Sequence, residues 1–237
     1  MKVIKYLCGT ICCISLILIL LISSFEIVIY GHKSFYQHEY VKYNVIKDIS
    51  MELKDILYVT DEMLDYLRGN RDDLTVYTTI KWEEKEFFNE KEKAHMHDVQ
   101  NLFLAGISLR VYSIICFIVA LGFPLILKLN WKYVLAKSFQ VGSLFIIIFV
   151  ALLSLIISTN FTKYFDIFHK LFFDNDLYLL DPNTDLLINI LPEGFFIDIS
   201  IEIGIVFVVT ILPTFILSSL YIHYYNIHKL NQEDKNI

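Results

Sequence analysis

The sequence predicts an all-α integral membrane protein, with four transmembrane helices and a small, mostly helical extracytoplasmic cap that holds at most a short β element. The 237-residue chain is 56% hydrophobic and only 19% charged, which is too apolar for a soluble domain of this length. Its apolar residues also gather into four windows of about 20 residues or more, each long enough to cross about 30 Å of hydrocarbon. These windows are about 6–30, 102–127, 134–157 and 199–221.

Lysines are found in the short flanks on one side of all four windows. Basic residues resist translocation, so the lysine-bearing flanks are expected in the cytoplasm together with both termini. The first window is longer than a signal-peptide core, and we interpret it as a retained anchor. The lysines used for this orientation are Lys2, Lys5, Lys128, Lys132, Lys137, Lys229 and Lys235.

Five segments follow from the windows. They are a first transmembrane helix (1–31), an extracytoplasmic cap (32–101), two transmembrane helices with a short cytoplasmic loop (102–157), an extracytoplasmic loop (158–198), and a fourth transmembrane helix with a cytoplasmic tail (199–237).

The cap itself has a readable local pattern. Segment 34–70 favours helix, with Thr60 expected as an N-cap and Gly69 as a stop. Segment 74–82 alternates like a short strand. From Phe87 onward the chain lacks glycine, proline and β-branched residues as far as position 98, which predicts a helix that continues into the second window.

Composition excludes several function classes. The net charge of −6 is carried largely by the extracytoplasmic segments, so we expect no nucleic-acid partner. We also find no phosphate-binding loop, serine elbow or zinc motif, and we expect no cofactor and no metal. All four cysteines lie in predicted spans and are expected to be small buried hydrophobes: Cys8, Cys12, Cys13 and Cys116.

Two histidines each follow an acidic residue by three positions. In NEKEKAHMHDV (89–99), residues two apart on a helix diverge by about 200°, so His95 and His97 cannot face one site. Residues three apart can, which groups Glu92, His95 and Asp98. In the second extracytoplasmic segment Asp166 precedes His169 in the same way. A carboxylate so placed can hold one imidazole nitrogen, fix the tautomer and raise the basicity of the other nitrogen.

Charged residues also lie inside the predicted spans, where they are costly in lipid. Arg110 lies about two turns into the second window, and Glu26 and Glu202 lie near the outer ends of the first and fourth. Two interpretations stay open. The three charges form a structural polar clasp, or they form the floor of an outward-facing site at headgroup depth.

The sequence resembles the bacterial lipoprotein intramolecular transacylases over nearly its whole length. The resemblance rests on YLRG at 66–69, on FNEKEKAHMHDV at 88–99, and on FHKLFFDNDLYLLDPNTDLLINILPEGFF at 168–196. Three positions depart from the family pattern, in which arginine, lysine and tryptophan are usual: Lys91, Gln100 and Tyr178.

The resemblance implies that an ester-linked acyl chain moves from the diacylglyceryl group of a lipoprotein's N-terminal cysteine to that cysteine's own α-amine. The partners would be diacylated lipoproteins and membrane lipid, at the extracytoplasmic face of the bacterial plasma membrane. His95 and His169 would be the catalytic pair. The supporting or orienting residues are expected to be Glu92, Asp98, Asp166, Asp181, Asp185 and Arg110, the last as a candidate oxyanion donor.

Elementary acid–base chemistry suits this reaction. The α-amine has a pKa of about 7.7–8.0 and imidazole one of about 6.5, so a neutral histidine can take the amine proton at modest cost. A second histidine can protonate the departing glyceryl oxygen. Because the amine is already tethered to its ester, no covalent enzyme intermediate is required. The sequence leaves open which histidine is the base and which the acid.

Two other functional hypotheses remain. In a di-metal carboxylate enzyme, Glu92/His95 and Asp166/His169 would join Glu26 and Glu202 as ligands. In a membrane assembly factor or sensor, the acidic cap would bind a partner and the histidines would be structural.

Overall fold

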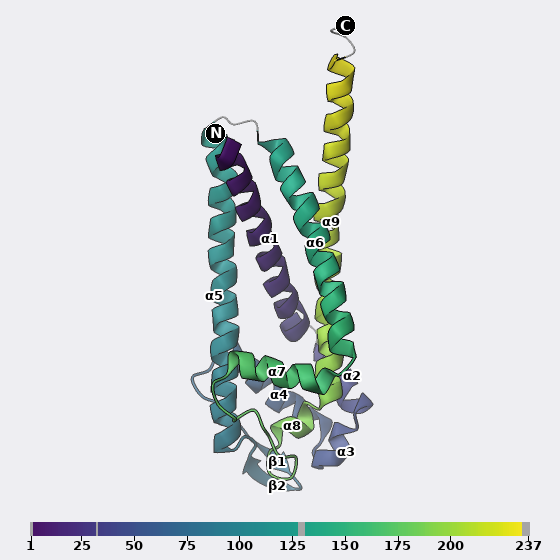
Figure 1. Cartoon of the computed structure of the whole chain (residues 1–237). Coiled ribbons are helices and arrows are strands. Elements are labelled where there is room, and N and C mark those ends of the chain that lie inside the picture. The colour runs from purple at the N-terminus through teal and green to yellow at the C-terminus, as the bar shows by residue number, and fades with distance from the viewer. Residues whose placement is uncertain (1, 32, 128–130, 234–237) are drawn as a thin grey trace. The chain divides into compact units, whose positions relative to one another are not determined.

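Four long apolar helices dominate the computed structural model, which describes residues 2–31, 33–127 and 131–233 (Figure 1). Each is long and apolar enough to cross a membrane, which confirms the predicted fold class. Of the lysines used to predict orientation, Lys128 and Lys235 lie outside the described residues. The four helices are α1 (Lys2–Gly31), α5 (Glu90–Ile126), α6 (Lys132–Ser158) and α9 (Glu193–Glu233).

The chain divides into two compact units. The helical unit comprises Met1–Phe25, Ser108–Ile156 and Ile203–Ile237, and the cap unit comprises Glu26–Ile107 and Ile157–Glu202. Both histidine motifs of the sequence therefore belong to the cap unit.

Within the helical unit, α1 and α6 approach closely at glycines. A Cβ atom added at Gly142 would come within 2.2 Å of Cys13 Sγ, so only glycine permits this approach. Cys8, Cys12 and Cys13 are buried and Cys116 is exposed, and all four are free thiols. The prediction of small buried residues is confirmed for the first three cysteines and is wrong for Cys116, which lies on an outer face of α5.

The cap unit is mainly helical, as predicted, and contains one hairpin. The strands pair antiparallel from Tyr77↔Glu86 to Ile80↔Glu83, through a turn at Lys81 and Trp82. The sequence predicted the first strand and missed the second. The remaining elements are α2 (Lys33–Lys42), α3 (Val45–Ile49), α4 (Leu53–Leu67), β1 (Tyr77–Ile80), β2 (Glu83–Glu86), α7 (Phe161–Phe172) and α8 (Leu187–Ile190).

Helix α4 shows one correct and one wrong prediction. Gly69 ends it with φ of +80°, a backbone conformation that glycine adopts without steric cost. Thr60 does not cap it, because α4 begins seven residues earlier at Leu53. The Thr60 hydroxyl is instead buried in mid-helix, where it donates to the Ile56 carbonyl at 2.8 Å and lies 2.6 Å from the Tyr40 hydroxyl.

Helix α5 begins at Glu90, three residues later than predicted, because a capping box sets its start. The Asn89 side chain accepts from the Glu92 backbone N–H at 3.0 Å, and Glu92 Oε2 accepts from the Asn89 N–H at 2.7 Å. The residue before this box, Phe88, is 1% exposed, and Phe87 continues the hairpin with a hydrogen bond to the Val76 carbonyl. The second Glu92 oxygen, Oε1, accepts from the Leu187 N–H at 2.6 Å.

Glu92→Gln is expected to lower the free energy of unfolding by about 1.5–3 kcal/mol. The substitution removes the negative charge and replaces one of the two oxygens that accept from buried backbone N–H groups by an NH₂ group. Thermal unfolding in detergent measures this. Glu90→Gln is the matched control: its side chain is 92% exposed at the same helix start, and its cost should stay below about 0.5 kcal/mol. Equal stability of the two variants would show that the carboxylate of Glu92 has no structural role.

Candidate functional site

Two imidazoles from separate parts of the chain meet in the cap unit. His95 comes from α5 and His169 from α7, and their ring centroids lie 5.9 Å apart with planes inclined by 34°. Each residue is only 7% exposed. Phe173 packs against both rings, at centroid distances of 5.5 and 5.7 Å. The pair is therefore held in a largely apolar, aromatic setting.

The surroundings of His169 define its tautomer. Its Nδ1 lies 2.7 Å from the Phe165 carbonyl oxygen, which can only accept, so Nδ1 carries the hydrogen. In the neutral ring the lone pair is then on Nε2, which makes no hydrogen bond within the described part of the chain. Burial lowers the pKa of His169 below its ordinary value, although the bond to Phe165 and the nearby Asp166 act in the opposite direction.

Asp166 does not hold His169 directly, contrary to the expectation from its spacing. Its two oxygens accept from Lys170 Nζ at 2.6 Å and from the Tyr178 hydroxyl at 2.9 Å. The hydrogen bond from Lys170 lowers the pKa of Asp166, which favours the carboxylate. Tyr178 stacks on the His169 ring at 4.6 Å and 22°. Tyr178 thus connects Asp166 to the His169 ring, while the charge of Asp166 acts directly to raise the pKa of His169.

Glu92 also departs from its expected role. Because both of its oxygens accept from backbone N–H groups, neither orients the ring of His95. His95 Nδ1 is buried and has no hydrogen-bond partner within the described residues. The i, i+3 spacing placed the carboxylate on the correct helix face, but nearby backbone donors compete for it.

The other acidic residues of the two motifs organise the loop between α7 and α8. Asp98 accepts from Asn175 Nδ2 at 2.8 Å. Asp185 is 3% exposed and accepts from Asn89 Nδ2 at 2.9 Å and from the Asp181 N–H at 2.8 Å. Asp181 accepts locally from the N–H and side-chain amide of Asn183, and Lys91 donates to Asp185 and to the Leu179 carbonyl. These residues support the site without contacting either imidazole.

Arg110 belongs to the helical unit. Its expected part in the site, as an oxyanion donor or an ion-pair partner, stays a prediction. Within residues 2–31, 33–127 and 131–233, no group of three or more His, Cys, Asp or Glu residues is placed to hold a metal ion. The di-metal alternative therefore has no ligand set in the described part of the chain.

The aromatic and carbonyl partners of the histidines are not among the residues predicted from the sequence. Phe165 and Phe173 lie four residues before and after His169, a spacing that puts them on the same helix face or its continuation. That signal was present in FDIFHKLFF, but aromatic residues near a membrane are too common to single out a site. Tyr178 stands out in the sequence only as a departure from the family pattern.

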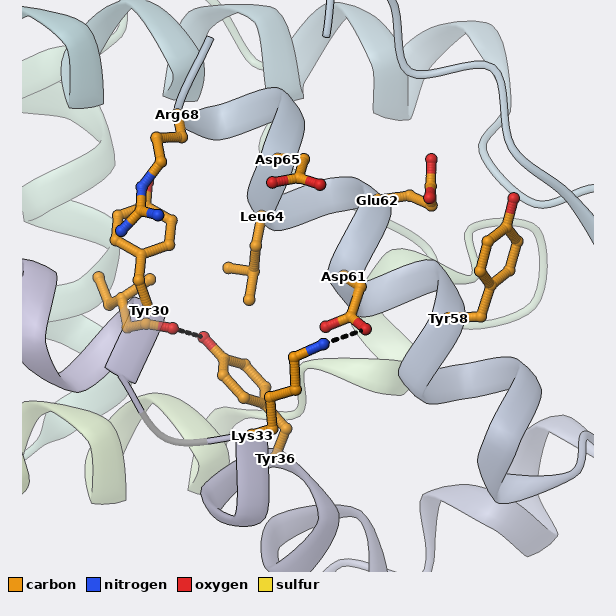
Figure 2. A pocket seen from close by; sticks show the side chains of 10 residues that line it. Tyr30, Lys33, Tyr36, Tyr58, Asp61, Glu62, Leu64, Asp65 and Arg68 are labelled. Atoms are coloured by element: carbon orange, nitrogen blue, oxygen red, sulfur yellow. Dashed lines mark hydrogen bonds and ion pairs between the residues drawn. The ribbon is translucent and has the colours of Figure 1, made fainter. Parts of the chain in front are cut away.

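The cap unit contains a hollow that neither of the two histidines lines. It has a volume of about 370 Å³, and Figure 2 shows its polar walls. The Arg68 guanidinium lies over the Tyr30 ring at 4.0 Å, and Lys33 pairs with Asp61 at 2.6 Å. Neither His95 nor His169 lines it, so this hollow is not the candidate catalytic site. Its lining residues are Ile29, Tyr30, Lys33, Tyr36, Tyr58, Asp61, Glu62, Leu64, Asp65 and Arg68.

Known proteins share both the sequence pattern and the fold. The sequence model of the family "Lipoprotein intramolecular transacylase Lit" matches residues 10–196. The structure of the membrane-integral Lit protein from Bacillus cereus aligns with a TM-score of 0.76 and 25% identity, over 97% of this chain and 100% of that one.

Two variants of the B. cereus protein, in which one histidine is replaced by arginine or by alanine, align with TM-scores of 0.73 and 0.74 at 23% identity. They cover 94% of this chain, and 94% and 96% of their own. No curated protein sequence matches the chain. Since the family match spans most of the 237 residues and the fold agrees, the chain belongs to the lipoprotein intramolecular transacylase family, Lit.

Proposed function

We propose that this protein transfers an ester-linked acyl chain within one lipoprotein molecule, from the diacylglyceryl group of the N-terminal cysteine to its own α-amine, and leaves an N-acylated lyso form. The family makes acyl transfer the reaction class. The observation that carries the finer proposal is the pair of buried imidazoles, 5.9 Å apart, contributed by the two motifs of the sequence. Two proton-transfer groups at this separation can serve one substrate.

In this proposal His169 takes the proton of the attacking amine. Its Nδ1–H is bound to the Phe165 carbonyl, so the free lone pair is on Nε2, as a general base requires. The carbon–nitrogen bond forms and the carbon–oxygen ester bond breaks. Burial lowers the pKa of His95 to about 4, so its ring is neutral at rest. His95 accepts the proton from His169 on one ring nitrogen and delivers the proton of its other ring nitrogen to the departing glyceryl oxygen, so both rings end neutral and the reaction consumes no net proton.

The intramolecular character of the reaction lowers the demands on the protein. The amine and the ester belong to one molecule, so much of the entropic cost of bringing two reactants together is avoided. The apolar rings around the histidines keep bulk water from competing with the amine for the ester. The main task of the cap unit is therefore to hold the two imidazoles in place within an apolar setting.

We place this site on the extracytoplasmic face of the bacterial plasma membrane, with both termini in the cytoplasm. The support is the lysine bias of the helix flanks, together with the membrane-integral character of the B. cereus relative. Diacylated lipoproteins and membrane lipid are the proposed partners.

His95→Ala and His169→Ala are each expected to lower lyso-lipoprotein formation by at least about 100-fold, because each removes a proton-transfer group. Mass spectrometry of lipoprotein N-terminal peptides from cells carrying each variant measures this. His97→Ala is the matched control, since its side chain is 63% exposed on the same helix and should leave the product unchanged. Unchanged lyso product in either of the first two variants would refute the assignment.

His169 should titrate below about 6.5, the ordinary value for the imidazole pKa, because burial disfavours its cation. Below about pH 6.5 this histidine binds a proton in the unfolded chain but resists protonation in the folded protein. The free energy of unfolding therefore decreases as the pH falls below about 6.5. NMR of ¹³C-histidine-labelled protein in detergent, with the signal assigned by its disappearance in His169→Gln, gives the midpoint. A midpoint at or above that of the denatured chain would contradict the apolar setting.

Tyr178→Phe keeps the ring that stacks on His169 but removes its hydrogen bond to Asp166. We expect kcat to fall roughly fivefold with KM little changed, as for the loss of one positioning hydrogen bond. Tyr178→Leu, which also removes the stacking, should lose more. Tyr58→Phe, on an exposed tyrosine of α4, is the control. Equal activity of all four proteins on a synthetic diacylated lipopeptide would remove Tyr178 from the site.

A further inference from the structure

Helix α7 has a polar and an apolar sector, and His169 lies at their border. At about 100° per residue, Thr162, Asp166, Lys170 and Lys163 fall within about 120° on one side of His169. The opposite sector is entirely apolar or aromatic, and it continues around to the other side of His169. Its members are Phe161, Tyr164, Phe165, Ile167, Phe168, Leu171 and Phe172.

Much of the apolar sector has no protein cover. Leu171 is 74% exposed, Phe172 50%, Ile167 46% and Phe168 41%. Four large apolar side chains exposed within two turns of one helix form a contiguous patch, which marks an interaction surface. His169, on the same helix, is 7% exposed and faces the protein.

The position of α7 in the chain identifies what this surface meets. Helix α6, which is long and apolar enough to span the membrane, ends at Ser158, and α7 begins at Phe161. Asn160 caps it by accepting from the Lys163 N–H at 3.1 Å. Three residues of chain span at most about 10 Å, so α7 starts at the membrane boundary. Lysines on the polar sector suit the phosphate layer at that boundary.

We propose that α7 is an interfacial helix whose apolar sector lies in the acyl region of the extracytoplasmic leaflet, with glycerolipid as its partner. In a diacylglyceryl lipid the esters lie where polar headgroup and acyl chains meet. The polar–apolar border of an interfacial helix lies at the same depth. Because His169 is on this border, the helix holds its imidazole level with the ester that reacts, a consequence that rests on the proposed function.

Depth-dependent fluorescence quenching tests the membrane contact without any assay of activity. Trp82 and Trp131 are replaced by phenylalanine, and Leu171→Trp is introduced as the probe, with Lys163→Trp as the matched control on the polar sector. The proteins are reconstituted into phosphatidylethanolamine–phosphatidylglycerol vesicles that contain acyl-brominated lipid. We expect blue-shifted emission and at least twofold stronger quenching for Leu171→Trp than for the control.

Equal quenching of the two probes would overturn the proposal. So would a blue-shifted Leu171→Trp probe that bromolipid does not quench and whose emission changes with protein density, because a second copy of the chain would then cover the sector. These outcomes stand whether or not the protein forms lyso-lipoprotein.

An activity experiment tests the consequence for depth. Leu171→Glu places a charge in the apolar sector and should lower turnover of a long-chain diacylated lipopeptide in bilayers by at least tenfold. It should change turnover of a short-chain, water-soluble analogue less than twofold, and Leu171→Phe should match wild type on both. Equal losses of turnover on both substrates would mean that Leu171→Glu disturbs the fold. That result would contradict the proposal that α7 sets the depth of His169 in the membrane. Absence of lyso product from the wild type would count against the proposed function, while the quenching result would still decide the membrane contact.

Discussion

The buried carboxylate of Glu92 is the contact on which the histidine site depends. It is 0% exposed, and it joins the N-terminus of α5 to the first residue of α8 through the N–H groups of Asn89 and Leu187. A buried charge is costly unless it is fully hydrogen-bonded, and here the bonds come from backbone donors at a helix N-terminus, where negative charge is favoured. His95 lies about one turn later on α5, so the contacts that fix the start of this helix also fix the position of His95. Asp185 reinforces the same junction through Asn89 and Lys91.

The acidic residues and the aromatic residues have different tasks in the cap unit. The carboxylates of Glu92, Asp98 and Asp185 bind backbone N–H groups or neutral and cationic side chains, and they fix one chain segment to another. Phe173 and Tyr178 surround the imidazoles and leave little water near them. Such a division favours neutral imidazoles, and the Phe165 carbonyl defines the tautomer of His169. It suits a reaction in which a proton moves from an amine to an alkoxide without net charge transfer to the enzyme.

Much of this architecture can be predicted from the sequence, because long apolar windows, lysine-bearing flanks and the unbroken 87–98 pattern each have one dominant physical explanation. Helix spacing also placed Glu92 and Asp166 on the faces of their histidines. Spacing could not predict their hydrogen bonds, because the competing donors, the Leu187 N–H and the Tyr178 hydroxyl, come from chain segments that only folding brings near. The hydrogen bond to the Phe165 carbonyl could not be predicted for another reason. Every residue has a backbone carbonyl, so the sequence does not indicate which one accepts a hydrogen bond.

The juxtaposition of His95 and His169 was expected from the family resemblance, since 73 residues separate them and no local pattern links them. Their separation of 5.9 Å is what makes a shared substrate physically reasonable. The most direct measurement is an experimental structure of the protein with a diacylated lipopeptide analogue in which an amide replaces the reactive ester. The account predicts the α-amine within hydrogen-bonding distance of His169 Nε2 and the glyceryl-side heteroatom next to His95. An analogue whose amine is bound in the Arg68 hollow, or beyond reach of both imidazoles, would contradict it.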